Sequence, residues 1–147
     1  MKNTWHQHML RVHYQDTDQM GVAHHSNYVG WFEIGRTEMM RDAGFAYSEM
    51  ERLGLLLPVV DMHLKYHQPA RYDEGMAIFT RVTNFSAARL EFEYEVRRIE
   101  DKQDGEMISP YGELLTSGST LHMWLNSEWK PARIDKAAPE VFAMLNR

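Results

Sequence analysis

The run "RLEFEYEVR" at residues 89–97 most constrains the fold, because it alternates strictly between apolar or aromatic and charged side chains. A period of two places alternate side chains on opposite faces of a β-strand. Leu90, Phe92, Tyr94 and Val96 would then face a core, and the charged residues between them would face water. One apolar and one charged face is typical of an antiparallel sheet that is wet on one side. The chain therefore needs a second layer to cover the apolar face.

Four more segments have strand character. In the first of them, Leu10, Val12 and Tyr14 fall on one face and polar residues on the other. The last carries Thr116, Gly118 and Thr120 on one face, small groups that let another chain or a ligand lie close. The predicted strands are residues 8–15, 59–66, 76–84, 89–97 and 113–125.

A long amphipathic helix lies between the first two strands. It starts at Ser26 or Asn27, either of which can cap it, and it ends at residue 43 before Gly44. Its apolar stripe has helical spacing and consists of Tyr28, Phe32, Gly35, Met39 and Ala43. Gly35 costs about 1 kcal/mol in a helix interior relative to alanine. We expect a closely packed sheet to offset that cost.

The predicted order is β-α-β-β-β-β, with a short helix at residues 48–53 and another within residues 138–147. One long helix and a sheet with one apolar face have an economical arrangement in which the sheet curls around the helix. The sequence predicts an α+β fold of one domain over residues 1–147, with a tail from about residue 129. One helix leaves apolar surface or a sheet edge uncovered, so we expect a homodimer.

Composition excludes several classes of function. The chain has no cysteine, which rules out a disulfide framework, a thiolate metal site and a cysteine nucleophile. The net charge of -5 argues against nucleic-acid binding, which needs a positive field. No apolar stretch approaches ~18 residues, and the first ten residues do not resemble a signal peptide. We expect a cytoplasmic protein with no membrane span.

The turn "YQDTDQMGVAHHSNY" at residues 14–28 concentrates the ionisable groups. A carboxylate in such a turn often bonds nearby amides, which is the simplest interpretation of Asp16 and of an isolated Asp-x-Asp pair. Asp18 lies about eight residues before the helix, too far to cap it. Its carboxylate can instead face whatever binds at the helix start.

The start of the helix offers free amides and about half a positive charge. These amides, from about His24 to Tyr28, can polarise a carbonyl and hold an oxyanion. Asp18 beside them can act as a nucleophile or as a general base on water. His24 and His25 are either loop residues or groups that orient water or donate a proton. Tyr14 is predicted to be a core or pocket residue.

Two other patterns have simpler interpretations. Glu33 and Arg36 are three residues apart on the helix and are predicted to form a surface pair. Paired histidines at residues 6 and 8, 24 and 25, and 63 and 67 lack an H-E-x-x-H motif. We therefore predict no metal site.

The segment "YQDTDQMGVAHHSNYVGWFEIGRTEMMRDAG" resembles the acyl-CoA thioesterases of the hotdog fold. The resemblance is to the 4-hydroxybenzoyl-CoA thioesterase type, including the YbgC-like group, and it extends over about residues 10–125. "VV" at 59–60, "PARYDE" at 69–74 and the F-x-Y-x-V strand at 92–96 follow in the family order. This resemblance implies a sheet wrapped around a long helix and an assembly of dimers or tetramers. It also implies hydrolysis of an acyl-CoA without a cofactor or metal.

The resemblance also implies roles for residues. Asp18 matches the catalytic aspartate, Tyr14 and His25 match assisting residues, and the carbonyl-polarising amide falls near His25. His24, Ser26, Asn27 and Tyr28 at the helix start are predicted to bind substrate, with Arg89 as a candidate for CoA. His24 and Ala23 depart from the YbgC-like pattern, so acyl selectivity is not carried over.

Two alternatives remain. One is a hotdog hydratase or dehydratase, although the F-P-G and D-x-N-x-x-H patterns of those enzymes are missing. The other is a non-catalytic module that binds acyl-CoA or another protein.

Overall fold

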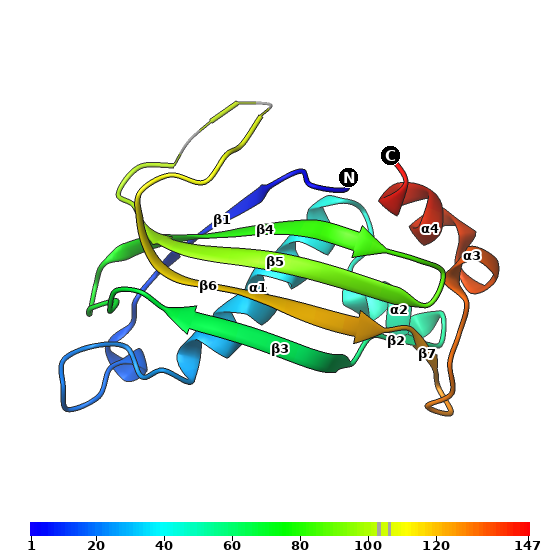
Figure 1. Ribbon diagram of the computed structural model, residues 1–147, viewed down its shortest axis with the longest axis horizontal. Helices are drawn as coiled ribbons and strands as arrows, with labels where there is room; N and C mark the ends of the chain where they lie inside the picture. Colours follow the sequence, from blue (N-terminus) through cyan, green and yellow to red (C-terminus); the bar gives the residue numbers. More distant parts are fainter. Residues whose placement is uncertain (103, 106) are drawn as a thin grey trace.

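The computed structural model describes residues 1–102, 104–105 and 107–147. A strand, a long helix and four more long strands follow in the predicted order (Figure 1). The long strands are β1 (His6–Arg11), β3 (Val59–Tyr66), β4 (Gly75–Phe85), β5 (Arg89–Arg98) and β6 (Glu113–Met123). The helices are α1 (Asn27–Asp42), α2 (Tyr47–Arg52), α3 (Ile134–Ala137) and α4 (Pro139–Leu145). A 3-10 turn, η1 (Tyr14–Asp16), and two short strands, β2 (Leu55–Leu56) and β7 (Leu125–Asn126), complete the set.

The long strands form one antiparallel sheet in the order β1-β4-β5-β6-β3, and α1 runs along one of its faces (Figure 1). This arrangement confirms the predicted α+β hotdog fold. The two predicted short helices are confirmed as α2 and α4, and α3 is one further short helix. Boundaries of α1 and the four later strands lie within two residues of those predicted.

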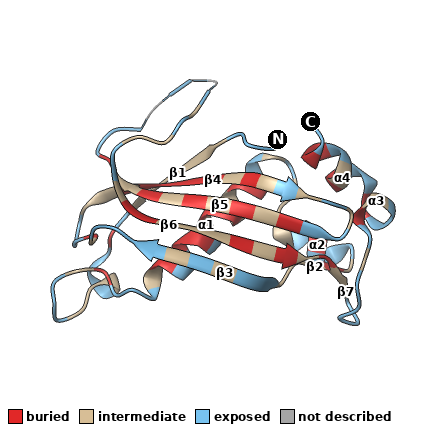
Figure 2. Ribbon diagram, in the orientation of Figure 1, coloured by how far each residue is buried: buried red, intermediate tan, exposed pale blue. Residues whose placement is uncertain are grey.

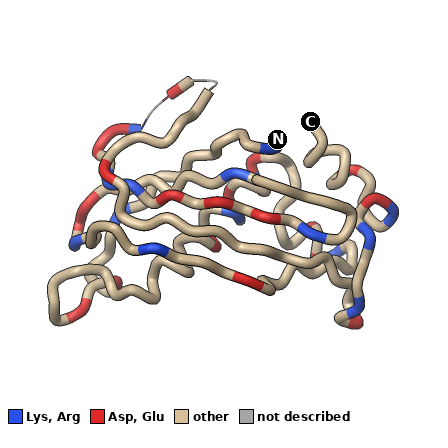
Figure 3. Tube along the Cα trace, in the orientation of Figure 1, with Lys and Arg blue, Asp and Glu red and all other residues tan. Residues whose placement is uncertain are grey.

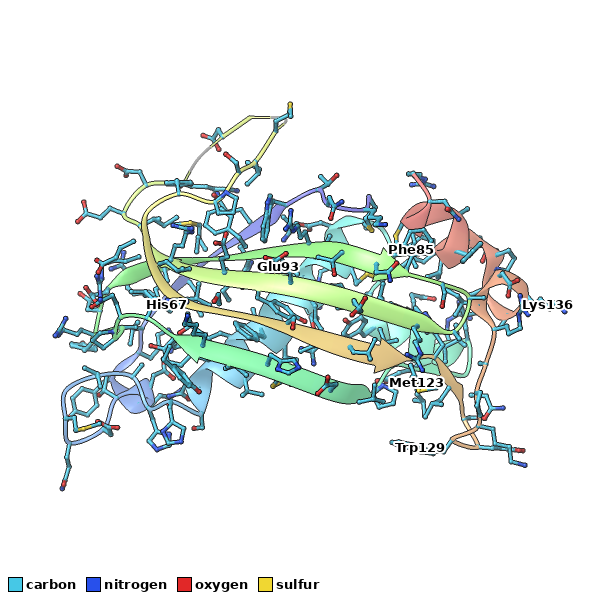
Figure 4. The ribbon with its side chains drawn as sticks, viewed as in Figure 1. His67, Phe85, Glu93, Met123, Trp129 and Lys136 are labelled. Atoms are coloured by element: carbon cyan, nitrogen blue, oxygen red, sulfur yellow. The ribbon has the colours of Figure 1, made fainter. Side chains whose placement is uncertain are left out.

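The predicted alternation in β5 is confirmed. Leu90, Phe92, Tyr94 and Val96 are fully buried, and the charged residues between them are part-exposed. Phe32 of α1 stacks on Tyr94 at 4.3 Å between ring centroids, so the helix and the sheet share one core. Acidic positions recur along β5 in Figure 3, and one of them, Glu93, is labelled in Figure 4.

The inner strand β4, next to the edge strand β1, is buried on both faces, as Figure 2 shows by its long red stretch. Ala77 and Phe79 form a second small core with Ile99 on the side away from α1. Partly buried side chains, among them Trp5 and Tyr111, cover this second core. The outer face of the sheet is therefore apolar near β4 and polar along β5 and β6.

The predicted extent of the first strand is wrong. β1 ends at Arg11, and the chain turns into η1 instead of continuing to residue 15. The Asp16 side chain accepts a hydrogen bond from the His13 amide at 2.8 Å, which bends the chain into a tight turn. A carboxylate that accepts a hydrogen bond from a nearby backbone amide competes with the hydrogen bonds between strands, so the strand can end there.

Gly35 lies where α1 packs most closely on the sheet. A Cβ atom at this position would lie 2.5 Å from Thr80 Oγ1 and 2.6 Å from Ile78 Cγ2 on β4. Both neighbours are fully buried and β-branched, so neither can move aside easily. The expected close approach of the sheet at Gly35 is confirmed.

A row of polar groups is buried between α1 and the sheet. His122 Nε2 and the Tyr94 hydroxyl both bond Thr120 Oγ1, at 2.8 and 2.6 Å. His122 Nδ1 lies 3.1 Å from the Leu57 carbonyl oxygen, to which it donates. Arg36 is only 9% exposed, and no ion pair with Glu33 occurs among the described residues. The predicted surface pair is therefore wrong, because the helix face that carries Arg36 is covered by α2 and the sheet.

The C-terminal tail packs into the main core. Val141, Met144 and Leu145 of α4 are buried in the main core, and Ile134 of α3 joins them. Figure 1 shows α3 and α4 at the end of the sheet opposite the start of α1. The tail therefore closes one end of the core and leaves the other end free for a site.

We predict opposite effects for one substitution at two positions of α1. Gly35→Ala should lower the free energy of unfolding by about 1–3 kcal/mol, because the added methyl overpacks against Thr80 and Ile78. Gly30→Ala, where a Cβ meets nothing within 4 Å, should raise it by up to about 1 kcal/mol through helix propensity. Urea unfolding of both variants tests this, and equal effects at the two positions would contradict the packing described.

His122 gives a prediction for acid stability. Burial lowers its pKa to about 4, the Leu57 hydrogen bond opposes that shift, and the nearby Arg36 charge adds to it. An unfolded histidine titrates near about 6.5, so between that pH and about 4 the unfolded chain binds a proton that the native protein does not. This group should therefore cost up to about 3 kcal/mol of stability as the pH falls through that window.

The measurement is the urea midpoint of unfolding at pH 7 and pH 4.5. His122→Gln should flatten its pH dependence relative to the wild type. Exposed His63 provides a matched control, and His63→Gln should keep the wild-type slope. A slope that is unchanged in His122→Gln would show that this histidine does not titrate as described.

Candidate functional site

Asp16 fastens the turn between β1 and α1. Its carboxylate accepts the His13 amide, and its carbonyl oxygen accepts the His24 amide at 2.8 Å. The same carbonyl accepts a hydrogen bond from Asn27 Nδ2 at 2.7 Å. Asp16 therefore has the turn-forming role predicted for it, and the Asn27 side chain ties the helix start to the turn.

Asp18 lies at the base of a second tight turn. Its Oδ1 accepts the Met20 amide at 2.9 Å, and its backbone pairs with Val22 at 3.1 Å. Gly21 closes the turn with a φ of 79°, a conformation that glycine adopts without strain. Only one carboxylate oxygen of Asp18 has a protein partner among the described residues. The other is free to act on a bound molecule.

A pocket of about 290 Å³ lies between this turn, the start of α1 and the end of β3. Asp18, His25 and Tyr28 contribute to it from the predicted set. Its wall also contains Tyr66, the last residue of β3, and the three residues that follow it, His67, Gln68 and Pro69. His67 is labelled in Figure 4, at the end of β3 that lies near the start of α1.

The amides at the start of α1 can be accounted for one by one. The His24 amide bonds Asp16, the Asn27 amide bonds the His24 carbonyl at 3.0 Å, and the Ser26 amide approaches His24 Nδ1 at 3.3 Å. The His25 amide has no hydrogen-bond partner among the described residues. It lies one residue before the N-cap of a helix, where the backbone dipoles favour negative charge. His25 is thus the position of an available donor.

Tyr66 supports this donor. Its hydroxyl donates to the His25 carbonyl oxygen at 3.0 Å, and its ring packs edge-on against His25 and Tyr28 at 6.5 and 5.4 Å between centroids. Tyr66 was not among the predicted site residues, and His67 was not connected with this site. The available signal was the polar run "YHQ" at residues 66–68, where the predicted strand ends.

Tyr28 forms the floor of the pocket. It is 2% exposed, and its hydroxyl accepts the Ala70 amide at 3.2 Å. Burial raises the pKa of Tyr28, which keeps the phenol neutral at physiological pH. Tyr28 therefore shapes the pocket and holds the following loop in place.

The other residues predicted at the helix start lie beside the pocket. His24 stacks on His25 at 4.1 Å between centroids, and its Nδ1 lies 2.8 Å from Ser26 Oγ. Neither His24, Ser26 nor Asn27 lines the pocket. Ser26 occupies the N-cap position but makes no side-chain capping bond.

The prediction for Tyr14 as a core or pocket residue is wrong within one chain. Tyr14 is 77% exposed, and its ring packs edge-on against Tyr72 at 5.7 Å. Tyr14 lies in η1, so the alternation that aligned it with Leu10 and Val12 no longer applies.

Arg89 lies at the other end of the sheet. On β6, Met123 pairs with Arg89 and Thr116 pairs with Tyr66. Seven residues of strand separate these pairs, a distance of roughly 23 Å. Within one chain, Arg89 is not part of the pocket at the start of α1.

Two further features are absent from residues 1–102, 104–105 and 107–147. In these ranges no three His, Asp or Glu side chains gather as a metal site would require. No helix there is both long and apolar enough to cross a membrane.

Comparison with known proteins places this chain in a family. The sequence pattern of the thioesterase-like superfamily matches residues 12–140. A Bacillus subtilis (strain 168) protein named "Putative acyl-CoA thioesterase YneP" is 34% identical over 132 residues, which cover 89% of this chain and 88% of that protein. The acyl-CoA thioester hydrolase YbgC of Escherichia coli O157:H7 is 34% identical over 92 residues, which cover 63% of this chain and 69% of that protein.

A solved structure supports the same assignment. A DHNA-CoA thioesterase from Staphylococcus aureus superposes with a TM-score of 0.86 at 30% identity, covering 97% of this chain and 89% of that one. The sequence match and the structural match both extend over most of the chain. The chain therefore belongs to the thioesterase-like superfamily and has its hotdog fold, as the sequence predicted.

Proposed function

We propose that this protein is an acyl-CoA thioesterase, which hydrolyses a thioester to a free acid and CoA. One observation carries the proposal. Asp18, whose carboxylate has a free oxygen, and His25, whose amide has no partner among the described residues, both line one pocket at the start of a helix. Family membership and the thioesterase names of the relatives support it.

The amide at His25 would receive the thioester oxygen. Attack on the carbonyl carbon moves negative charge onto that oxygen, and an N–H donor at a helix start stabilises it. Removal of one such donor in other enzymes costs about 2.7–4 kcal/mol of barrier. The Tyr66 hydroxyl, which holds the His25 carbonyl, fixes the peptide that precedes the helix.

Asp18 would supply the base or the nucleophile. As a base it takes a proton from water, the hydroxide adds to the carbonyl carbon, and the carbon–sulfur bond breaks to release CoA thiolate, which is then protonated. As a nucleophile its free oxygen attacks the same carbon and releases CoA, and water cleaves the resulting anhydride. Both routes give one acid and one thiol from one thioester and one water. The Met20 amide on Oδ1 would hold the carboxylate in place in either route.

The remaining site residues would have supporting roles. The His25 imidazole lines the pocket and would orient water or protonate the departing thiolate. Tyr28 and the end of β3 would contact the acyl group, because they form the pocket walls. Tyr14 and Arg89 lie outside this pocket in one chain and have no place in the proposed step.

We also propose that the protein is a homodimer joined through β3. This strand is an edge of the sheet, and most of its residues are exposed. Val60 and Tyr66 are 50% and 51% exposed on it. An unpaired edge with apolar side chains favours pairing with another strand. Because Tyr66 also lines the pocket, such pairing would bring a second chain to the site.

We predict that Asp18→Asn lowers the turnover of acyl-CoA by at least about 100-fold, because general base catalysis contributes about 10²–10⁴-fold. Asparagine keeps an oxygen for the Met20 amide, so the turn should survive. Free-thiol release from short, long and aromatic acyl-CoAs measures turnover, and circular dichroism checks the fold.

The matched control is Asp73→Asn, an exposed aspartate outside the pocket, which should keep wild-type turnover. Near wild-type thiol release by Asp18→Asn would refute the mechanism. Wild-type protein that binds acyl-CoA but releases no thiol would indicate a binding module.

A further inference from the structure

A second cavity of about 160 Å³ lies beside the middle of α1, against α2 and the β2–β7 pair. It shares no lining residue with the pocket at the start of α1. Its walls combine apolar side chains, such as Met50, Leu55 and Leu57, with three hydrogen-bond donors. These donors are Arg36, Tyr47 and Trp124. The proposed thioester chemistry uses none of them.

Each of the three donors has an unpartnered buried atom. Arg36 Nη1, Tyr47 Oη and Trp124 Nε1 are buried, and none makes a hydrogen bond of good geometry among the described residues. The Arg36 and Tyr47 side chains do lie close enough to each other to interact. Arg36 is 9% exposed and Trp124 is 1% exposed. Leaving such groups unpaired costs about 1–3 kcal/mol each, and more for a charged group.

Arg36 brings a positive charge that the described residues do not neutralise by an ion pair. Its charge lies close enough to Tyr47 and Tyr94 to oppose the rise that burial causes in their pKa values. Burial dominates for Tyr47 and raises its pKa, so its hydroxyl remains a neutral donor. The polar side of the cavity therefore presents one cation and two neutral groups able to donate.

The complementary ligand is an anion with several acceptor positions and an apolar body. A carboxylate accepts several hydrogen bonds and matches the fork of a guanidinium. An engineered apolar cavity of about 150 Å³ in another protein binds benzene, so this volume fits a single ring. We propose that this cavity is a second binding site, which takes a small carboxylate with a one-ring or similarly sized apolar body.

Two negative charges lie at the rim of this cavity. Glu33 and Glu51 also line the cavity, and both are exposed. Their negative charges are screened by water but oppose an entering anion. Binding should therefore tighten when a rim charge is removed and weaken when the buried charge is removed. A cavity that holds only water would show neither effect.

The test is a titration of the full chain with sodium benzoate at pH 7, followed by NMR of the tryptophan indole N–H signals. Trp124→Phe identifies the Trp124 signal. We expect saturable binding that shifts this signal. Arg36→Met should weaken binding at least tenfold, whereas Arg41→Met, an exposed arginine of the same helix, should leave it unchanged.

Further variants and one uncharged ligand serve as comparisons for benzoate binding. Glu33→Gln should tighten benzoate binding, and benzyl alcohol, which lacks the charge, should bind at least tenfold more weakly. Asp18→Asn should bind benzoate as the wild type does, which separates this site from the proposed active site. If Arg36→Met does not fold, Tyr47→Phe replaces it and should weaken binding several-fold. The proposal is overturned if the Trp124 signal shows no saturable shift, or if the folded variant of Arg36 or Tyr47 binds benzoate like the wild type.

Discussion

The contact between Gly35 and β4 determines where the rest of α1 lies. Because no Cβ fits between the helix and Thr80 or Ile78, only glycine allows this approach. One turn earlier, Phe32 reaches Tyr94 and stacks on it. Two turns earlier, Tyr28 forms the floor of the pocket. The helix start is thereby held between the Asp18 turn and the end of β3, where its dipole can act on a bound carbonyl.

Periodicity predicted the parts of this fold that depend on one buried face. The alternation of β5 and the stripe on α1 reflect the same core from its two sides, so both elements were located within a residue or two. Gly35 inside the stripe predicted close packing, because its helix-propensity cost needs a compensating contact. Asp18 was singled out by its distance from the helix start, and it does line the pocket.

Other features depend on contacts that no local pattern encodes. Tyr14 lies outside the observed strand, contrary to the prediction. The reason is that the Asp16 carboxylate accepts a hydrogen bond from the His13 amide, which turns the chain. Tyr66 lies beside His25 only because β3 is the edge strand next to the start of α1, which strand order decides. Arg36 has the spacing of a surface ion pair with Glu33, yet α2 and Tyr94 cover it. Each case is a tertiary contact that overrides a local pattern.

The central claim is that a thioester carbonyl lies between the Asp18 side chain and the His25 amide. A crystal structure of the Asp18→Asn variant with bound acyl-CoA tests it most directly. We expect the thioester oxygen within about 3.1 Å of the His25 nitrogen, with the residue 18 side chain facing the carbonyl carbon. A thioester bound elsewhere, with residue 18 turned to bulk water, would contradict the account.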